Sequence, residues 1–511
     1  MKVPLTVKDF FRRAEQVYGP RTAVVDEPQV LGGGLGDITW SQFSELARGQ
    51  ASRLDELGFA PGERVAMVSQ NAARLLVSLS GVCGSGRIFV PINFRLNEEE
   101  IRYIVEHSGA RMLLFDPSMK PIVDNLAVEH KVMLGTDSDD FVFGGNGDSK
   151  PWAGDEDATA TINYTSGTTA RPKGVQLTHR NLWTNAMSFG LHAGVSDRDV
   201  YLHTLPMFHC NGWGMPFVLA GMGAKQVVLR AVDGADILHR IQHHGVTLMC
   251  GAPAVLARIL EAAASWEGPI PGHGKVRFVT AGAPPPTRTI ERVETELGWE
   301  LMQIYGLTET APLLTINRRR AEDDELSPHD RAARLGRAGA PALGVEIRVD
   351  ESGEVLARSN HVLEGYWEQP EATAEAVRGG WFHTGDGGRL DDEHYVSITD
   401  RKKDVIITGG ENVSSVEVED VLFSHSAVAE VAVIGVPDEK WGEMVKALVV
   451  LTPGASADEQ ELILHCRNEL AHYKCPKSIE FREELARTAT GKLQKYKLRA
   501  PYWEGLDRQV N

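Results

Sequence analysis

The chain has 511 residues, which is too long for one ordinary domain and enough for two or three. It carries 70 acidic and 53 basic residues, and the resulting net charge of −17 argues against the basic face of a nucleic-acid-binding protein and against binding to anionic lipid. The five cysteines form no CxxC pair and no apolar run reaches the roughly 18 residues of a membrane span, so we expect a cytoplasmic protein without a disulfide framework.

The first part of the chain alternates short apolar runs with helical patterns. The runs that predict buried strands are residues 64–70, 87–93, 111–116, 224–230, 245–253 and 275–284. Residues 71–86 and 97–109, which separate the first three runs, predict helices. Strands that alternate with helices indicate βαβ units in a mostly parallel sheet, and ligands of such sheets bind beyond the carboxyl ends of the strands.

The pattern of apolar and polar residues changes twice towards the C-terminus. Residues 337–399 contain short alternating segments separated by Gly and Asp turns, which is typical of a β-rich region. From Asp400 onward an α+β pattern of about 110 residues follows, close to the common size of a domain. We therefore predict an α/β protein: a large N-terminal domain of stacked α/β sheets plus a β-rich subdomain at residues 1–399, and a small α+β domain at residues 400–511.

Residues 164–175, with the sequence YTSGTTARPKGV, form the first string that indicates chemistry. Hydroxyl groups and glycine N–H groups can wrap phosphate oxygens, and Lys173 adds a positive charge. The string is not a Walker P-loop, because Pro172 and Gly174 stand where that motif needs its second glycine and its final hydroxyl. On composition alone, a plain polar loop explains the string equally well.

Three later strings each have a functional and a structural interpretation. In YGLTET, residues 305–310, Tyr305 offers a flat face for a base and Glu309 a carboxylate for Mg²⁺, whereas Thr308 can instead cap a helix. Asp386, in WFHTGDGGRL, can accept hydrogen bonds from a ribose or form an ordinary Asx turn. Lys492, in RTATGKLQKYKLR, fits a site as well as a solvated basic tail. Taken alone, each string favours the structural interpretation.

Taken together, in this order and spacing, the four strings resemble the ATP-dependent adenylate-forming (AMP-binding) superfamily, in its acyl- or aryl-CoA synthetase branch. Residues 91–110 and the histidine-containing segment 205–216 match as well, so the resemblance covers essentially the whole chain. It implies an enzyme, an AMP-forming acid–thiol ligase, that uses ATP, Mg²⁺ and coenzyme A.

The resemblance also implies a role for each matching residue. The β and γ phosphates would bind Thr165, Ser166, Gly167, Thr168, Thr169 and Lys173. The adenine and the acyl group would lie beside Gly282, Ala283, Pro284, Gln303, Ile304, Tyr305 and Gly306. Thr308 would contact the α-phosphate, and Thr165 and Glu309 would bind Mg²⁺. Asp386 and Arg401 would bind the ribose hydroxyls.

In this family the C-terminal domain rotates between two half-reactions, and Lys403 resembles the hinge position. Lys492 would be the adenylation lysine, because its charge offsets the repulsion between a carboxylate and the α-phosphate. After rotation, the turn with Gly409, Gly410 and Glu411 would line a tunnel for the pantetheine arm of CoA. His209 would gate that tunnel, unless it is a packed core histidine.

We therefore expect a carboxylate–CoA ligase that acts on a short-chain, medium-chain or aromatic acid. An apolar acyl pocket would be shaped by Met187, Phe189, Trp213, Met215 and Phe217, although apolar residues at such spacing are also common in a plain core. The expected partners are the acid, ATP and CoA, with no nucleic acid and no membrane span, and the resemblance is compatible with a homodimer.

Two other hypotheses stay open. The first is an adenylating enzyme that passes the activated acid to a different acceptor, such as an amine, a carrier-protein thiol or an inorganic nucleophile. The second is a non-catalytic binding module on the same fold, because fold alone does not determine function.

Overall fold

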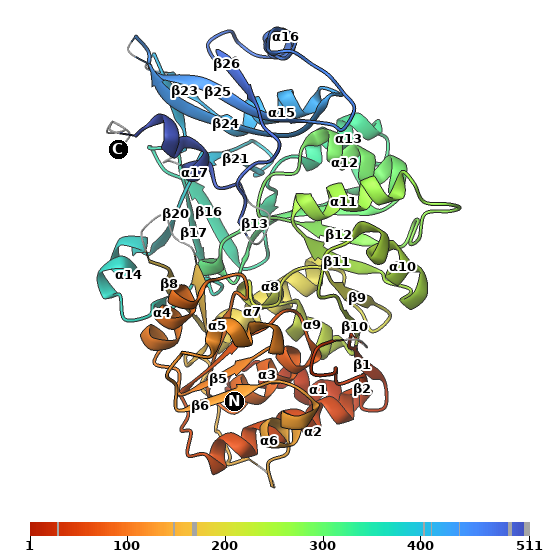
Figure 1. Cartoon of the computed structure of the whole chain (residues 1–511), viewed down its shortest axis with the longest axis vertical. Coiled ribbons are helices and arrows are strands. Elements are labelled where there is room, and N and C mark those ends of the chain that lie inside the picture. Colours follow the sequence, from red (N-terminus) through yellow and green to blue (C-terminus); the bar gives the residue numbers. More distant parts are fainter. Residues whose placement is uncertain are drawn as a thin grey trace.

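The computed structural model describes residues 1–27, 30–146, 149–165, 171–401, 404–409, 411–438, 440–488 and 493–504. Within this part of the chain the strands form four sheets (Figure 1). Two large sheets and a smaller β-rich sheet lie in the N-terminal four fifths, and the fourth sheet lies at one end of the molecule. No helix in the described segments is long and apolar enough to cross a membrane.

A seven-stranded sheet has the order β18-β8-β7-β4-β3-β5-β6. Its strands are β3 (Arg64–Val68), β4 (Ile88–Ile92), β5 (Met112–Phe115), β6 (His130–Met133), β7 (Thr159–Thr165), β8 (Lys173–Thr178) and β18 (Gly365–Tyr366). The central strands β4, β3, β5 and β6 are parallel, and the helices α3 (Ala73–Cys83) and α4 (Glu98–Ser108) connect three of them. The side chain of Asn97 caps α4 by accepting a hydrogen bond from the Glu100 N–H.

A nine-stranded sheet has the order β15-β14-β13-β12-β11-β9-β10-β1-β2. Its strands are β1 (Thr22–Val25), β2 (Asp37–Thr39), β9 (Val200–His203), β10 (Lys225–Val228), β11 (Leu248–Gly251), β12 (Arg277–Thr280), β13 (Glu300–Gly306), β14 (Leu313–Asn317) and β15 (Ala340–Pro341). The strands β9 to β13 run parallel, so their carboxyl ends share one edge. The connections from β10 through β13 contain the helices α10 (Gly234–His244), α11 (Pro253–Ala263) and α12 (Thr287–Arg292).

The largest hydrophobic core contains residues from both large sheets and from the helices that pack against them. These helices are α1 (Lys8–Tyr18), α2 (Trp40–Glu56), α3, α7 (His179–Ala193) and α9 (Met215–Met222). The outer face of the nine-stranded sheet packs against α10 and α11, and the outer face of the seven-stranded sheet packs against α4. Helices therefore cover both faces of each large sheet, as the continuous apolar runs of its strands require.

The β-rich sheet and the C-terminal sheet have five strands each. The first contains β16 (Val345–Val349), β17 (Glu354–Ser359), β19 (Val377–Arg378), β20 (Trp381–Leu390) and β21 (Val396–Arg401). The second contains β22 (Ile406–Thr408), β23 (Glu411–Val413), β24 (Val428–Asp438), β25 (Gly442–Leu451) and β26 (Ser478–Phe481). The helices of the C-terminal unit are α15 (Ser415–Ser424), α16 (Glu459–Glu469) and α17 (Lys495–Arg499). This arrangement confirms the predicted α/β fold class.

Candidate functional site

The carboxyl ends of β12 and β13 carry two of the predicted segments. After β12 the chain turns at Gly282, which has a φ of +97°, and Gly282, Ala283 and Pro284 are exposed. After β13, the backbone of Gly306 lies so close to the loop that follows that an added Cβ would lie 1.6 Å from the Pro312 carbonyl oxygen. Only glycine fits there, which explains the YGL sequence physically. Gln303 and Ile304, earlier in β13, are buried.

A tyrosine and an aspartate from different sheets meet at this edge. The Tyr305 hydroxyl, at the end of β13, donates a hydrogen bond of 2.8 Å to the buried carboxylate of Asp386 in β20. Asp386 is the backbone neighbour of Arg401 in β21, so the two residues predicted to bind ribose lie on adjacent strands. The half-buried ring of Tyr305 and the carboxylate of Asp386 therefore place a flat aromatic face next to a hydrogen-bond acceptor.

A second group joins a lysine, a tyrosine and a glutamate. Lys173, at the start of β8, has its Nζ atom 4.7 Å from the centre of the Tyr366 ring, and the Tyr366 hydroxyl donates a hydrogen bond of 2.9 Å to Glu309 Oε1. Burial and the nearby charge of Glu309 raise the pKa of Tyr366 well above its ordinary value, so the hydroxyl stays protonated. Thr165, at the end of β7, is the backbone neighbour of Lys173. Ser166, Gly167, Thr168 and Thr169 lie outside the described residues.

Tyr366 is a site residue that no pattern in the sequence indicates. It lies in the two-residue strand β18, which is too short for any periodicity to indicate. Pairing of β18 with β8 puts Tyr366 opposite Val175, two residues beyond Lys173. The backbone N–H of Leu363 also donates to the Glu309 carbonyl at 2.7 Å, so residues before β18 fix the segment that carries Glu309.

Thr308 and His209 lie in neighbouring loops. Thr308 is buried and begins a short 3-10 helix, η3 (Thr308–Thr310), so Leu307 rather than Thr308 precedes the helix. The Cys210 thiol lies 3.9 Å from the Thr308 carbonyl oxygen. His209 is half-buried immediately before α8 (Cys210–Trp213).

The loop that carries His209 has an unusual backbone. Cys210, Asn211 and Trp213 all have positive φ angles, of 48°, 52° and 61°. Each such residue costs about 1–2 kcal/mol relative to a right-handed conformation. The buried side chain of Asn211 holds the loop against β7, because its amide donates to the Thr161 hydroxyl at 3.0 Å. Backbone strain of this kind, when supported by hydrogen bonds, is typical of functional loops.

The predicted acyl pocket is wrong for one of its five residues, Met187, and the other four are buried in the largest hydrophobic core. Met187 lies on the surface, with 47% of its area exposed, because it faces outward from α7. Phe189 is fully buried in the core. Phe217 is fully buried and packs against Phe10 and Phe11 of α1. Trp213 and Met215 are buried in the segment that follows His209.

In the C-terminal unit, the turn between β22 and β23 carries the residues predicted to line the tunnel for CoA. Thr408 and Glu411 are backbone neighbours there, and Gly409 and Glu411 are exposed. Gly409 has a φ of +61°, and its N–H donates to the Trp441 carbonyl at 2.8 Å. The predicted hinge, tunnel and adenylation residues lie outside the described residues; they are Lys403, Gly410 and Lys492.

A buried polar network connects the strand before the predicted hinge to the helix after the predicted lysine loop. Ser415 donates from both its N–H and its hydroxyl to Asp400, at 3.0 and 2.5 Å. Lys495 contacts the Ser415 hydroxyl and forms an ion pair of 2.8 Å with Glu419. Burial lowers the pKa of Lys495, but the charges of Glu419 and Asp400 outweigh burial and raise it above its ordinary value. The network therefore ties β21, α15 and α17 together.

Two further contacts join the C-terminal unit to the nine-stranded sheet. The N–H and the hydroxyl of Thr287 in α12 both donate to the Asp420 carboxylate, each at 3.0 Å. Arg288 donates to the His425 carbonyl at 3.3 Å. The C-terminal unit thus packs against α12, the helix that follows the loop with Gly282 after β12 (Figure 1).

Comparison with known proteins gives matches over nearly the whole chain. The family of AMP-binding enzymes matches residues 10–367, and the C-terminal domain of AMP-binding enzymes matches residues 417–492. The chain is 36% identical to 2-methylpropanoate–CoA ligase CCL4 of Humulus lupulus, over 97% of this chain and 95% of the relative. It is also 36% identical to 4-hydroxybutyrate–CoA ligase 2 of Metallosphaera sedula, over 97% of this chain and 94% of the relative.

Among solved structures, the fold is similar to that of the anthranilate CoA ligase AuaEII in complex with anthranoyl-AMP. The TM-score is 0.88 and the sequence identity 27%, with 98% of each chain covered.

Proposed function

Because the chain belongs to the family of AMP-binding enzymes and is an AMP-forming acid–thiol ligase, we propose that its substrate is a short-chain, medium-chain or aromatic carboxylic acid. The observation that carries this proposal is the chemistry of the named relatives. Two act on a short-chain acid by name, 2-methylpropanoate and 4-hydroxybutyrate, and a third on an aromatic acid, anthranilate. The buried Trp213 and Met215 beside His209 suit an apolar acyl group of limited size.

The first half-reaction joins the acid to AMP. A carboxylate oxygen of the acid attacks the α-phosphorus of ATP. The bond between that phosphorus and the bridging oxygen breaks, and pyrophosphate leaves with the oxygen and the electron pair. Both reactants are anionic, so positive charge must reduce their repulsion and positioning must lower the entropic cost. We assign this charge to Lys173 on the side of the β and γ phosphates and to Lys492 at the α-phosphate.

The adenosine moiety has a proposed site at the end of β13. The Tyr305 ring would stack on the adenine, beside the exposed loop of Gly282, Ala283 and Pro284. The Asp386 carboxylate would accept hydrogen bonds from the ribose hydroxyls with Arg401 beside it. Thr308 would contact the α-phosphate.

The donor set around Glu309 fits Mg²⁺, which prefers oxygen ligands. The Glu309 carboxylate is half-buried and has one oxygen held by the hydroxyl of Tyr366, whose ring contacts Lys173. We propose that Glu309 and Thr165 hold the ion, which when bound neutralises phosphate charge. Tyr366 keeps the carboxylate oriented.

The second half-reaction transfers the acyl group to CoA. The CoA sulfur attacks the acyl carbon of the adenylate, and AMP leaves with the oxygen that came from the acid. The proposed domain boundary at Asp400 and the hinge at Lys403 would let the C-terminal domain exchange Lys492 for the turn at Gly409, Gly410 and Glu411. His209 would separate the acyl pocket from the thiol tunnel. A cytoplasmic location and a homodimer stay predictions, and one curated relative carries a peroxisomal name.

A panel of carboxylic acids tests the proposed substrate class. The purified chain is incubated with ATP, Mg²⁺ and each acid, from two-carbon to long-chain aliphatic acids and substituted benzoates, with and without CoA. We expect thioesters of short-chain, medium-chain or aromatic acids by product mass. Thioesters of long-chain acids alone would contradict the substrate class. An adenylate that accumulates with CoA but reacts with an amine or with a carrier-protein thiol would contradict CoA as the acceptor.

A further inference from the structure

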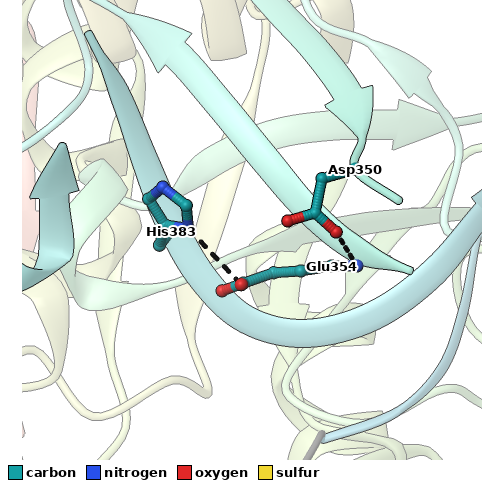
Figure 2. A group of neighbouring side chains, drawn as sticks. All are labelled: Asp350, Glu354 and His383. Atoms are coloured by element: carbon teal, nitrogen blue, oxygen red, sulfur yellow. Dashed lines mark hydrogen bonds and ion pairs between the residues drawn. The ribbon is translucent and has the colours of Figure 1, made fainter. Parts of the chain in front are cut away.

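A cluster of three titratable side chains lies next to the part of β20 that carries Asp386. Figure 2 shows Asp350, from the turn before β17, with Glu354 of β17 and His383 of β20. One ligand-type atom of each lies within 4.8 Å of the others. The mechanism proposed above uses none of the three, so their arrangement needs its own explanation.

The cluster sits at an irregularity in the pairing of β17 with β20. Leu356 is the backbone neighbour of His383, and Glu354 is the neighbour of Gly387. Between these two pairs β17 has one residue and β20 has three. The extra residues of β20 form a bulge that contains Gly385 and Asp386. A bulge removes N–H groups from the ladder, so the N–H of Gly385, an exposed residue, is available to a side-chain acceptor.

The Glu354 carboxylate supplies the missing acceptor. Its Oε1 atom accepts a hydrogen bond of 2.9 Å from the Gly385 N–H, and only 5% of the residue is exposed. Its Oε2 atom lies 3.4 Å from His383 Nδ1 (Figure 2). The Glu354 backbone is held in turn by Asp350, whose Oδ1 accepts from the Glu354 N–H at 2.9 Å.

Hydrogen bonds continue from this support to Asp386. Thr384, on the near side of the bulge, donates to the Val355 carbonyl at 2.6 Å and accepts from the Asp386 N–H at 3.1 Å. The Asp386 carboxylate in turn accepts a hydrogen bond of 2.8 Å from the Tyr305 hydroxyl. The direction of that carboxylate therefore depends on the shape of the bulge.

The same atoms argue against a metal ion in this cluster. Glu354 Oε1 already accepts from Gly385, and Asp350 Oδ1 accepts from the N–H and the hydroxyl of Ser352. The Arg378 guanidinium lies 3.2 Å from His383 Nδ1, where its positive charge would repel a cation. The three side chains are therefore better explained by the hydrogen bonds that hold Glu354 and the bulge of β20.

We propose that Glu354 is a positioning residue for nucleotide binding: it holds the bulge of β20 so that the Asp386 carboxylate faces the ribose of ATP. This inference rests on the proposed ribose site. Without Glu354 the Gly385 N–H loses its acceptor, the bulge relaxes towards a regular ladder, and Asp386 turns away from Tyr305. Glu354 touches no substrate, so its loss acts through Asp386.

Discrimination between ATP and 2′,3′-dideoxy-ATP tests the proposal, because only ATP has the hydroxyls that Asp386 would bind. The ratio of the two dissociation constants is measured for the parent chain and for variants. Hydrogen bonds to a charged group give the parent a preference for ATP of about tenfold or more. Glu354→Ala should lose this preference, and Glu354→Gln, whose amide oxygen still accepts from Gly385, should keep most of it.

Further variants separate the proposal from a general loss of structure. Glu354→Asp keeps the charge but withdraws the oxygens by one methylene, so it should lose part of the preference even if Glu354→Ala does not fold. The double variant of Glu354→Ala and Asp386→Ala should discriminate no less than Asp386→Ala alone. Glu346→Ala, which removes an exposed carboxylate from β16 of the same sheet, is the matched control and should behave as the parent.

Two results would overturn the proposal. Glu354→Ala and Glu354→Asp that both retain the preference would show that Asp386 needs no support. Equal weakening of ATP and dideoxy-ATP would indicate a structural role only. A preference that survives in Asp386→Ala would instead overturn the ribose assignment within the proposed function, and the two failures are therefore distinguishable.

Discussion

At the scale of single residues, the site depends on side chains that come together only in the folded chain. Glu309 and Asp386 stand in strings that indicate chemistry, but their hydrogen-bond donors, Tyr366 and Tyr305, differ in how far sequence reveals them. Tyr305 belongs to the same string as Glu309, whereas Tyr366 is separated from it by 57 positions. Tyr366 and Glu354 became visible only from the pairing of β18 with β8 and of β17 with β20.

Tyr366→Phe tests the orientation of Glu309. The substitution keeps the ring beneath Lys173 but removes the hydroxyl that donates to Glu309. A hydrogen bond to a charged group contributes about 1.5–3 kcal/mol, so we expect the Mg²⁺ concentration for half-maximal adenylation to rise about tenfold or more. The measurement is pyrophosphate release against Mg²⁺ at fixed ATP. Tyr473→Phe, at an exposed position, is the control, and an unchanged Mg²⁺ requirement would contradict the role of Tyr366.

Lys492→Ala tests the assignment of the adenylation lysine. Loss of its charge at the α-phosphate should slow formation of acyl-AMP by about a hundredfold or more, yet spare thioester formation from supplied acyl-AMP. Gly410→Leu should do the reverse, if the turn at Gly410 lines the thiol tunnel as proposed. Each half-reaction is followed separately by product mass. Equal losses in both half-reactions would refute the assignment for the variant concerned.

At the scale of helices and strands, the sequence predicted most of the parallel core. The runs at 64–70, 87–93 and 111–116 became β3, β4 and β5, because a strand buried on both faces reads as a continuous apolar run. The helix predicted at 97–109 became α4, whose cap and acidic first turn are local signals. The left-handed loop at Cys210 and the bulge at Gly385 were not predicted, because tertiary contacts hold them.

Two buried histidines should make the large sheets sensitive to acid. Burial lowers the pKa of His203, in β9, from 6.5 to about 4, and burial lowers the pKa of His179, at the start of α7, to about 4. In the unfolded chain each imidazole binds a proton near pH 6.5, but in the folded chain only near pH 4. Their contribution to stability is therefore complete above pH 6.5 and is lost as the pH falls towards 4.

His203→Gln checks this pH dependence, since glutamine is neutral and can still meet Gln226 of β10. The parent chain should lose on the order of 2 kcal/mol more than the variant between pH 7 and pH 5. The measurement is the free energy of unfolding in urea for the first transition at several pH values. Identical pH dependence in parent and variant would contradict a neutral buried His203.

At the scale of the whole molecule, buried polar contacts connect the C-terminal unit to the rest of the chain. Asp400 belongs to β21 of the β-rich sheet, whereas Ser415, Glu419 and Lys495 belong to the C-terminal unit. The side chains of Lys495 and Glu419 are 12% and 16% exposed. Charges this buried stabilise a fold only as a pair, because either one alone remains desolvated.

Variants of the Lys495–Glu419 pair test its contribution to stability. Lys495→Met should cost about 3–5 kcal/mol of unfolding free energy, because Glu419 is left buried without its partner. Adding Glu419→Leu should recover most of the loss. The control is Lys474→Met, which breaks a more exposed ion pair with Glu417. Glu417 lies on α15 like Glu419, and this loss should cost under about 1 kcal/mol of unfolding free energy. Equal losses of unfolding free energy for Lys495→Met and Lys474→Met in calorimetry would contradict a special contribution of the buried pair.

The central claim is that the chain joins an acid to CoA through an acyl-adenylate. The most direct measurement uses the preferred acid labelled with oxygen-18 in both carboxylate oxygens, together with ATP, Mg²⁺ and CoA. We predict AMP that carries one heavy oxygen and a thioester that keeps the other, because the carboxylate oxygen that attacks the α-phosphorus leaves with AMP. Unlabelled AMP, or label found in inorganic phosphate together with ADP, would contradict the claim.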